Sequence, residues 1–106
     1  MVEIVPVMQS DVRFLGIVLY FPKCTMRMLF NRKLMILDSC FDIQTMSEKC
    51  PVSMIQCSSG NFETMFDSRV LRISQNTLKT GIQTGMKVKE AIECIFSQKE
   101  TSEEFF

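Results

Sequence analysis

The stretch of this sequence that most limits its fold is an uncharged apolar run, FLGIVLYF, at residues 14–21. A helix that crosses a membrane needs about 20 apolar residues, so this run is too short to be one. Phe, Ile, Val and Tyr favour strands, and Pro22, which follows directly, cannot continue a central strand. The sequence therefore predicts a core strand that is covered on both faces.

The segments around this run alternate between apolar and polar residues with the period of two that is typical of strands. Residues 2–8 (VEIVPVM) are predicted to form an edge strand, because Pro6 has no amide hydrogen to donate. Residues 25–31 and 34–43 alternate in the same way and are separated by a short polar segment. That arrangement predicts a β-hairpin.

The second half of the chain is predicted to add more strands and then one helix. The expected strands are residues 52–57, 62–67 and 69–74, followed by a loop at 75–85. A helical pattern is strong in MKVKEAIECIFSQK at residues 86–99, where one apolar stripe contains Val88, Ala91, Ile92, Ile95 and Phe96. A stripe of this width is typical of a helix that packs on a core.

These patterns predict a single α+β domain over residues 1–99 with a short acidic-aromatic tail at residues 100–106. The fold is expected to be mainly antiparallel β, with about six or seven strands in a meander, a small barrel or a sandwich, and one C-terminal amphipathic helix packed on the sheet. This order of elements resembles that of pleckstrin-homology-like barrels and polo-box modules. The resemblance concerns architecture alone, since the chain has no Trp to match the one common in pleckstrin-homology helices.

The composition argues against several kinds of chemistry. Histidine is absent, which removes the usual general base, Ser-His and Cys-His nucleophile pairs and His-containing metal sites. Asp38 and Asp42 are expected on the solvated face of one strand, about 13 Å apart, too far to act as an acid/base pair on one bond. We therefore predict no catalytic residues, no cofactor and no metal, and a protein that is not an enzyme.

The five cysteines are an odd number without a C-x-x-C pair, and Met1–Ser10 lacks the features of a secretory signal. We expect free thiols and an intracellular protein, cytoplasmic or nuclear, without a transmembrane segment. Cys24, which is close to Lys23 and Arg27, comes nearest to the electropositive setting of a reactive thiol.

The favoured function is a non-catalytic protein–protein interaction or scaffold module that acts as a homodimer or as a subunit of a larger complex. An edge strand can add a strand from a partner, and methionine is over-used on adaptable binding surfaces. The expected partner is another protein or a second copy of the chain. The predicted partner-binding residues are Val2, Ile4, Met26, Met28, Phe105 and Phe106.

Two further features leave alternatives open. An anionic ligand, either a phosphoinositide headgroup or a nucleic acid, could bind the basic residues around the 31–33 turn, which are Lys23, Arg27, Arg32 and Lys33. The equal numbers of basic and acidic residues, 12 of each, weigh against nucleic acid as the main partner. The ending TSEEFF is similar to the acidic-aromatic peptides read by CAP-Gly domains, which implies a ligand for another protein; alternatively, its phenylalanines fold back on the sheet.

Overall fold

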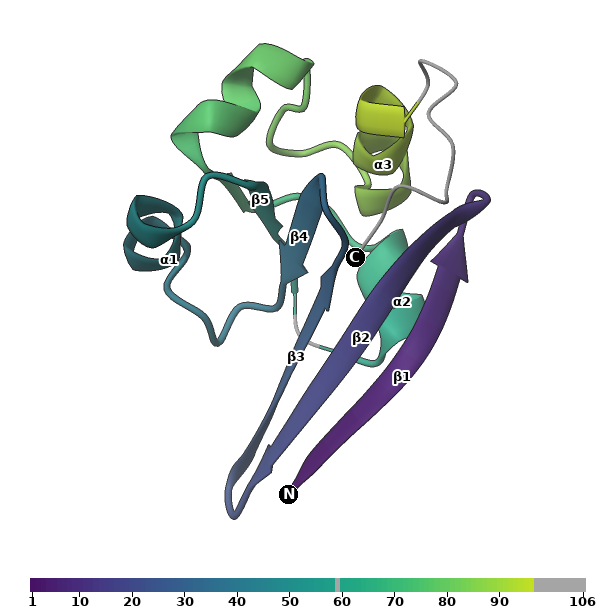
Figure 1. Ribbon diagram of the computed structural model, residues 1–106, viewed down its shortest axis with the longest axis vertical. Helices are drawn as coiled ribbons and strands as arrows, with labels where there is room; N and C mark the ends of the chain where they lie inside the picture. The colour runs from purple at the N-terminus through teal and green to yellow at the C-terminus, as the bar shows by residue number, and fades with distance from the viewer. Residues whose placement is uncertain (59, 97–106) are drawn as a thin grey trace.

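The computed structural model of the protein, which describes residues 1–58 and 60–96, contains one open sheet of six strands (Figure 1). In the order of the sheet, which is also that of the chain, the strands are β1 (Val2–Gln9), β2 (Val12–Phe21), β3 (Cys24–Phe30), β4 (Leu34–Leu37), β5 (Ser53–Gln56) and β6 (Arg72–Ile73). All neighbours are antiparallel except β4 and β5, which are parallel. The prediction of a mainly antiparallel α+β fold is confirmed, with a single open sheet in place of a barrel or sandwich.

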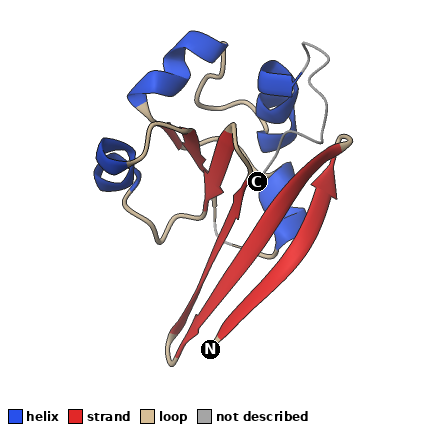
Figure 2. Ribbon diagram, viewed as in Figure 1, coloured by secondary structure: helices blue, strands red, loops and turns tan. Residues whose placement is uncertain are grey.

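The helices correct part of the sequence analysis. They are α1 (Ile43–Lys49), α2 (Phe62–Asp67), the 3-10 helix η1 (Gln75–Thr80) and α3 (Val88–Phe96) (Figure 2). The sequence predicts strands where α1 begins and throughout α2, and both predictions are wrong. Both helices begin at a polar cap, because the side chains of Asp42 and Asn61 each accept a hydrogen bond from the backbone amide three residues on. Helices thus lie between the strands, an order that differs from that of pleckstrin-homology-like barrels.

The main core lies between one side of the sheet and the helices α2 and α3. Phe14 of β2 is 1% exposed, and its ring centroid lies 6.0 Å from that of Phe66 in α2 and 6.4 Å from that of Phe96 in α3. Ala91 and Ile92 of α3 are fully buried in the same cluster. We call this side of the sheet the covered side.

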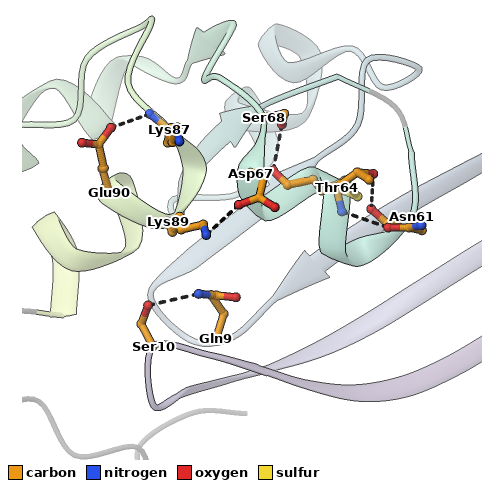
Figure 3. A network of polar contacts seen from close by, with 10 residues as sticks. Gln9, Ser10, Asn61, Thr64, Asp67, Ser68, Lys87, Lys89 and Glu90 are labelled. Carbon is orange, nitrogen blue, oxygen red and sulfur yellow. Dashed lines mark hydrogen bonds and ion pairs between the residues drawn. The ribbon is translucent and has the colours of Figure 1, made fainter.

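Polar contacts hold α2 and α3 in place at the surface (Figure 3). The Lys89 ammonium of α3 forms an ion pair with Asp67 of α2, with 2.6 Å between Nζ and Oδ1. Glu90 accepts a hydrogen bond of 2.8 Å from the backbone amide of Lys87, which satisfies a donor at the start of α3. The two helices over the covered side are therefore joined by polar contacts as well as by the core.

On the opposite side of the sheet, α1 covers β4 and β5. It connects these two parallel strands, which need a crossover because a tight turn cannot join them. Ile43 of α1 packs with Leu37 of β4 and Met54 of β5 in a second, smaller cluster, and Met28 of β3 packs against the same cluster. In Figure 1, α1 lies beside β4 and β5, while the long ends of β1, β2 and β3 project beyond all the labelled helices.

All five cysteines are free thiols. Within residues 1–58 and 60–96, no helix is both long and apolar enough to cross a membrane.

Candidate functional site

The side of β1–β3 that faces away from α2 and α3 carries apolar side chains in regular rows. The antiparallel register aligns three rows across the strands: Val2–Leu19–Met26, Ile4–Ile17–Met28 and Pro6–Leu15–Phe30. The row at one end pairs Phe21 with Cys24, and the row at the other end pairs Met8 with Arg13. We call this set of residues the open face.

No described helix covers the β1 side of the open face. Ile4 is 61% exposed, Val2 and Met8 are each 58% exposed, and Phe21 is 50% exposed. On this side of β2, Leu15, Ile17 and Leu19 are half-buried and Phe21 is exposed, whereas Phe14 and Val18 on the covered side are buried, so the prediction of a strand buried on both faces is wrong. Single exposed apolar residues are common, whereas a contiguous apolar patch marks an interaction surface or an aggregation risk.

Arg13 carries the only charge among the residues of the open face. Two other charged side chains of these strands project from the covered side. Glu3 accepts a hydrogen bond of 2.8 Å from the Tyr20 hydroxyl, and this bond is the main cause that raises the pKa of Tyr20 above its ordinary value. Arg27 donates through Nη1 to the carbonyl of Gly60 at 2.8 Å. The middle of the open face is thus uncharged.

The free edge of β1 has a gap in its hydrogen-bonding groups. Met1 and Tyr20 exchange two hydrogen bonds, because the Tyr20 amide donates to Met1 O at 2.9 Å and the Met1 ammonium donates to Tyr20 O at 3.4 Å. Hydrogen-bonded pairs alternate along an antiparallel ladder, so Ile4, Pro6 and Met8 direct their backbone groups away from β2. Pro6 supplies no donor there, which weakens pairing with an added strand.

Four of the six predicted partner-binding residues lie together on the open face. Val2 and Met26 belong to one row, and Ile4 and Met28 to the next. Phe105 and Phe106 lie outside the described residues. The odd-numbered residues of β2, Pro6 and Phe30 also belong to the open face but are not among the predicted partner-binding residues. The unbroken apolar run at residues 14–21 indicates these positions, because a strand that is apolar on both faces favours burial of both.

The predicted basic group is divided between three places. Arg32 and Lys33 line one surface pocket of about 530 Å³, together with Ser53 and Thr80 among others. Arg27 lies on the covered side and bonds Gly60, as described above. Lys23 is in the β2–β3 turn, at the opposite end of β3 from the pocket. The structure therefore brings together two of the four residues.

The two carboxylates predicted on one solvated face have different environments. Asp38 is fully buried; its Oδ2 accepts from the Arg27 amide at 2.8 Å and its Oδ1 from the Cys40 amide at 2.9 Å. Asp42 caps α1, and a hydrogen bond from the Thr45 hydroxyl is the first cause that lowers the pKa of Asp42. The solvated-face prediction is wrong for Asp38, which fixes the backbone after β4.

The thiols also differ in their setting. Cys24 is exposed at the end of the open face, whereas Cys57 is buried, and burial raises the pKa of Cys57 to about 11. Within residues 1–58 and 60–96, no three His, Cys, Asp or Glu side chains gather in a way that could hold a metal ion. A groove of about 660 Å³ lies between α1 and the β6–η1 segment, where Leu71 and Leu78 are exposed.

Comparison with known proteins adds a likeness in fold. No protein-family model matches the chain, and no curated protein matches its sequence. A crystal structure of a protein of unknown function from Thermoplasma acidophilum superposes with a TM-score of 0.77 and 14% sequence identity, over 90% of this chain and 93% of that one. At this identity the likeness shows only that the two chains share a fold, and the shared fold spans almost all of each chain.

Proposed function

We propose that this protein is a non-catalytic interaction module that binds another protein chain through the open face. The observation that carries the proposal is the set of three aligned apolar rows, whose β1 residues no described helix covers. Burial of apolar surface is the main favourable term in most protein association, and a contiguous patch supplies it.

The use of the polar groups supports binding rather than catalysis. Both carboxylate oxygens of Asp38 accept hydrogen bonds from backbone amides. The raised pKa of Cys57 keeps that thiol protonated and unreactive. The free thiols are also consistent with action inside the cell, in the cytoplasm or nucleus.

A capture experiment with a matched control tests the interaction role. The wild-type protein, an Ile4→Glu variant and a Leu78→Glu variant are immobilised and exposed to extract. Ile4 and Leu78 are similarly exposed, at 61% and 63%, but only Ile4 lies on the open face. We expect the wild type and Leu78→Glu to retain the same bound protein and Ile4→Glu to lose it. Equal retention by all three would place the contact elsewhere.

A second candidate function is the binding of an anionic ligand, because Arg32 and Lys33 line one pocket with the hydroxyl-bearing Ser53 and Thr80. Titration with anionic vesicles and with an oligonucleotide, each over a series of salt concentrations, tests it. Binding that weakens with salt and is lost in Arg32→Ala, but not in Lys23→Ala, would support this function. Binding that ignores salt, or no binding, would reject it.

A further inference from the structure

The last turn of α3 forms part of the wall of the pocket that contains Arg32 and Lys33. Cys94 and Ile95 line this pocket of about 530 Å³, which we call the basic pocket. α3 ends one residue after Ile95, so the acidic-aromatic tail of residues 100–106 begins within a few residues of the pocket wall. We propose that this tail binds in the basic pocket of its own chain and closes the pocket to other anions.

The tail and the basic pocket have opposite charges. The tail contains no basic residue and three acidic ones, Glu100, Glu103 and Glu104. Arg32 and Lys33 are the only charged side chains among the described residues that line the pocket. Arg32 is exposed and has no ion-pair partner in the part of the chain that the structure describes. Opposite charges attract most strongly where solvent is partly excluded, as it is in a pocket.

A second pocket beside the end of α3 has an acidic residue instead. It has a volume of about 250 Å³ and is lined by residues of α3 and of the β1–β2 hairpin, namely Ile92, Glu93, Phe96, Ser10 and Val12. Glu93 is the only charged one among these described residues, and it repels the glutamates of the tail. Of the two pockets that the end of α3 borders, charge therefore favours the basic pocket.

The tail is long enough to turn back into the basic pocket. An extended chain spans at most about 3.6 Å per residue, so Glu103, seven residues after Phe96, can lie up to about 25 Å from the end of α3. The basic pocket is much closer, because the last turn of α3 lines it. The excess length lets the chain reverse its direction before Glu103 and Glu104 meet the cations.

The aromatic end of the tail also has suitable contacts in this pocket. Pro51, Val52 and Ile95 give the pocket an apolar lining next to its cations. A Phe side chain left in water exposes a large apolar surface, and a guanidinium over a Phe ring is a favourable contact. The order of the tail, in which glutamates precede Phe105 and Phe106, thus matches a pocket that combines cations with apolar residues.

Attachment to the same chain makes even a weak contact effective. Exposed ion pairs contribute little singly, but a short linker gives the tail an effective concentration of the order of millimolar at the pocket. An anion from solution has to compete with this concentration. The closing role of the tail thus rests on the anion-binding function suggested above, whereas the contact between the tail and the pocket does not depend on it.

Cross-linking of the unaltered full chain tests the contact directly. A carbodiimide joins a carboxylate to an amine only where the two groups touch. We expect an amide between Lys33 and a tail glutamate, identified by mass spectrometry, and no such link to Lys23 at the opposite end of β3. A mixture of unlabelled and isotopically labelled chains separates links within one chain from links between chains. Absence of the Lys33 link, or links that form mainly between chains, would overturn the proposal.

The thiol of Cys94 reports whether the pocket is covered. Iodoacetamide is expected to alkylate Cys94 severalfold faster in the variant Glu103→Gln/Glu104→Gln, which we call the tail variant, than in the wild type. Cys24, which is exposed at the end of the open face, should keep its rate in both proteins. High salt should speed the reaction of Cys94 in the wild type, because it screens the ion pairs. Equal rates for Cys94 in the two proteins would overturn the closed pocket.

Exchange of the charges identifies the partner of the tail. Arg32→Glu should make Cys94 more reactive, as the tail variant does. Adding Glu103→Lys and Glu104→Lys to Arg32→Glu should restore part of the protection, because the ion pair is reversed while Lys33 keeps its charge. The same two tail substitutions combined with Lys23→Glu are the matched control and should leave Cys94 reactive. Failure of the reversed pair to protect Cys94 would overturn the assignment to the basic pocket.

Vesicles of phosphatidylcholine with phosphatidylserine separate this proposal from the anion-binding function. If both hold, the tail variant binds them more tightly than does the wild type or Glu48→Gln/Glu63→Gln, a control that removes the same charge from two other exposed sites. A Lys33 link without vesicle binding in any of these proteins supports the tail contact and rejects lipid headgroups as ligands. Equal vesicle binding by the tail variant and the control, with no Lys33 link, overturns the tail contact and leaves the anion-binding function in place.

Discussion

The ring of Phe62 in α2 lies against the backbone of Gly16 in β2. A Cβ atom at position 16 would come 2.7 Å from Cζ of Phe62 and 2.9 Å from Cε2. Glycine within a strand often marks such a close approach. Here it lets α2 settle on the covered side of the sheet, above the same strand that presents the open face on its other side.

Gly16→Ala is therefore expected to destabilise the protein by about 1–3 kcal/mol, the usual cost of overpacking a well-packed core. Phe62→Leu removes the clashing ring atoms, so the double variant should be more stable than the sum of the single effects predicts. Urea unfolding of the four proteins measures the coupling. Strictly additive effects would show that the ring does not limit position 16.

The β1–β2 turn contains two non-glycine residues with positive φ, Ser10 at 55° and Asp11 at 63°. These angles define a two-residue turn of type I′, in which glycine is preferred at the second position. Asp11→Gly should relieve the left-handed strain and raise the free energy of unfolding by about 0.5–1 kcal/mol.

Lys23→Gly in the β2–β3 turn is the matched control, since Lys23 does not have a positive φ. It should be neutral or destabilising, because glycine there only adds freedom to the unfolded chain. Thermal unfolding followed by circular dichroism compares the two variants. Equal effects would mean that the strain at Asp11 is not released.

Asp38 and Asp42 should respond differently to the same substitution. Asp38→Asn leaves one side-chain oxygen for two backbone donors, the amides of Arg27 and Cys40. The loss of a buried hydrogen bond should cost about 1–3 kcal/mol. Asp42→Asn keeps a good helix cap, so it should change stability little at neutral pH. Chemical unfolding of both variants checks this, and similar losses would contradict it.

The Asp67–Lys89 ion pair should make stability depend on acid pH. The hydrogen bond and charge of Lys89 hold the pKa of Asp67 below its ordinary value of 3.8. Asp67 is thus less readily protonated in the folded state than in the unfolded chain. Its contribution is present above its unfolded pKa and is lost as pH falls through the lower folded pKa.

Asp67→Asn should therefore weaken the fall in unfolding free energy when the protein is taken from neutral to strongly acidic pH. The effect should be small, because the pair is exposed to solvent. Lys89→Met should act in the same way, and the double variant should add nothing further. A steeper acid dependence in Asp67→Asn would reverse the sign argued here.

The strands of the first half could be predicted because their residues alternate over long stretches, and Pro6 correctly indicated an edge. Residues 62–67 were more ambiguous. FETMFD alternates as a strand would, but Phe62, Met65 and Phe66 also have helical spacing, and Asn61 before them is a good cap. In so short a segment the helix cap and the tertiary contacts determine whether a helix or a strand forms, and the periodicity of the sequence does not.

The open face could not be derived from the run at 14–21 alone. Phe14 and Ile17 are both apolar, and a sequence pattern states only that each prefers to be covered. Which of them receives a cover depends on where α2 and α3 pack, and those helices come from much later in the chain. Phe41 and Ile43 illustrate the same limit: both join the cluster of Leu37, as their spacing suggested, but through a turn at Asp38 and a helix.

The order in which the elements occur has a consequence for biosynthesis. β1, β2 and β3 pair through local turns and are synthesised before α3, which completes the cover over Phe14 in the main core. Hairpins form within microseconds, while translation adds only about 5–20 residues per second. For several seconds each nascent chain therefore carries a β1–β3 meander whose covered side has not yet received α2 and α3, and the β1 residues of its open face stay exposed after these helices have packed.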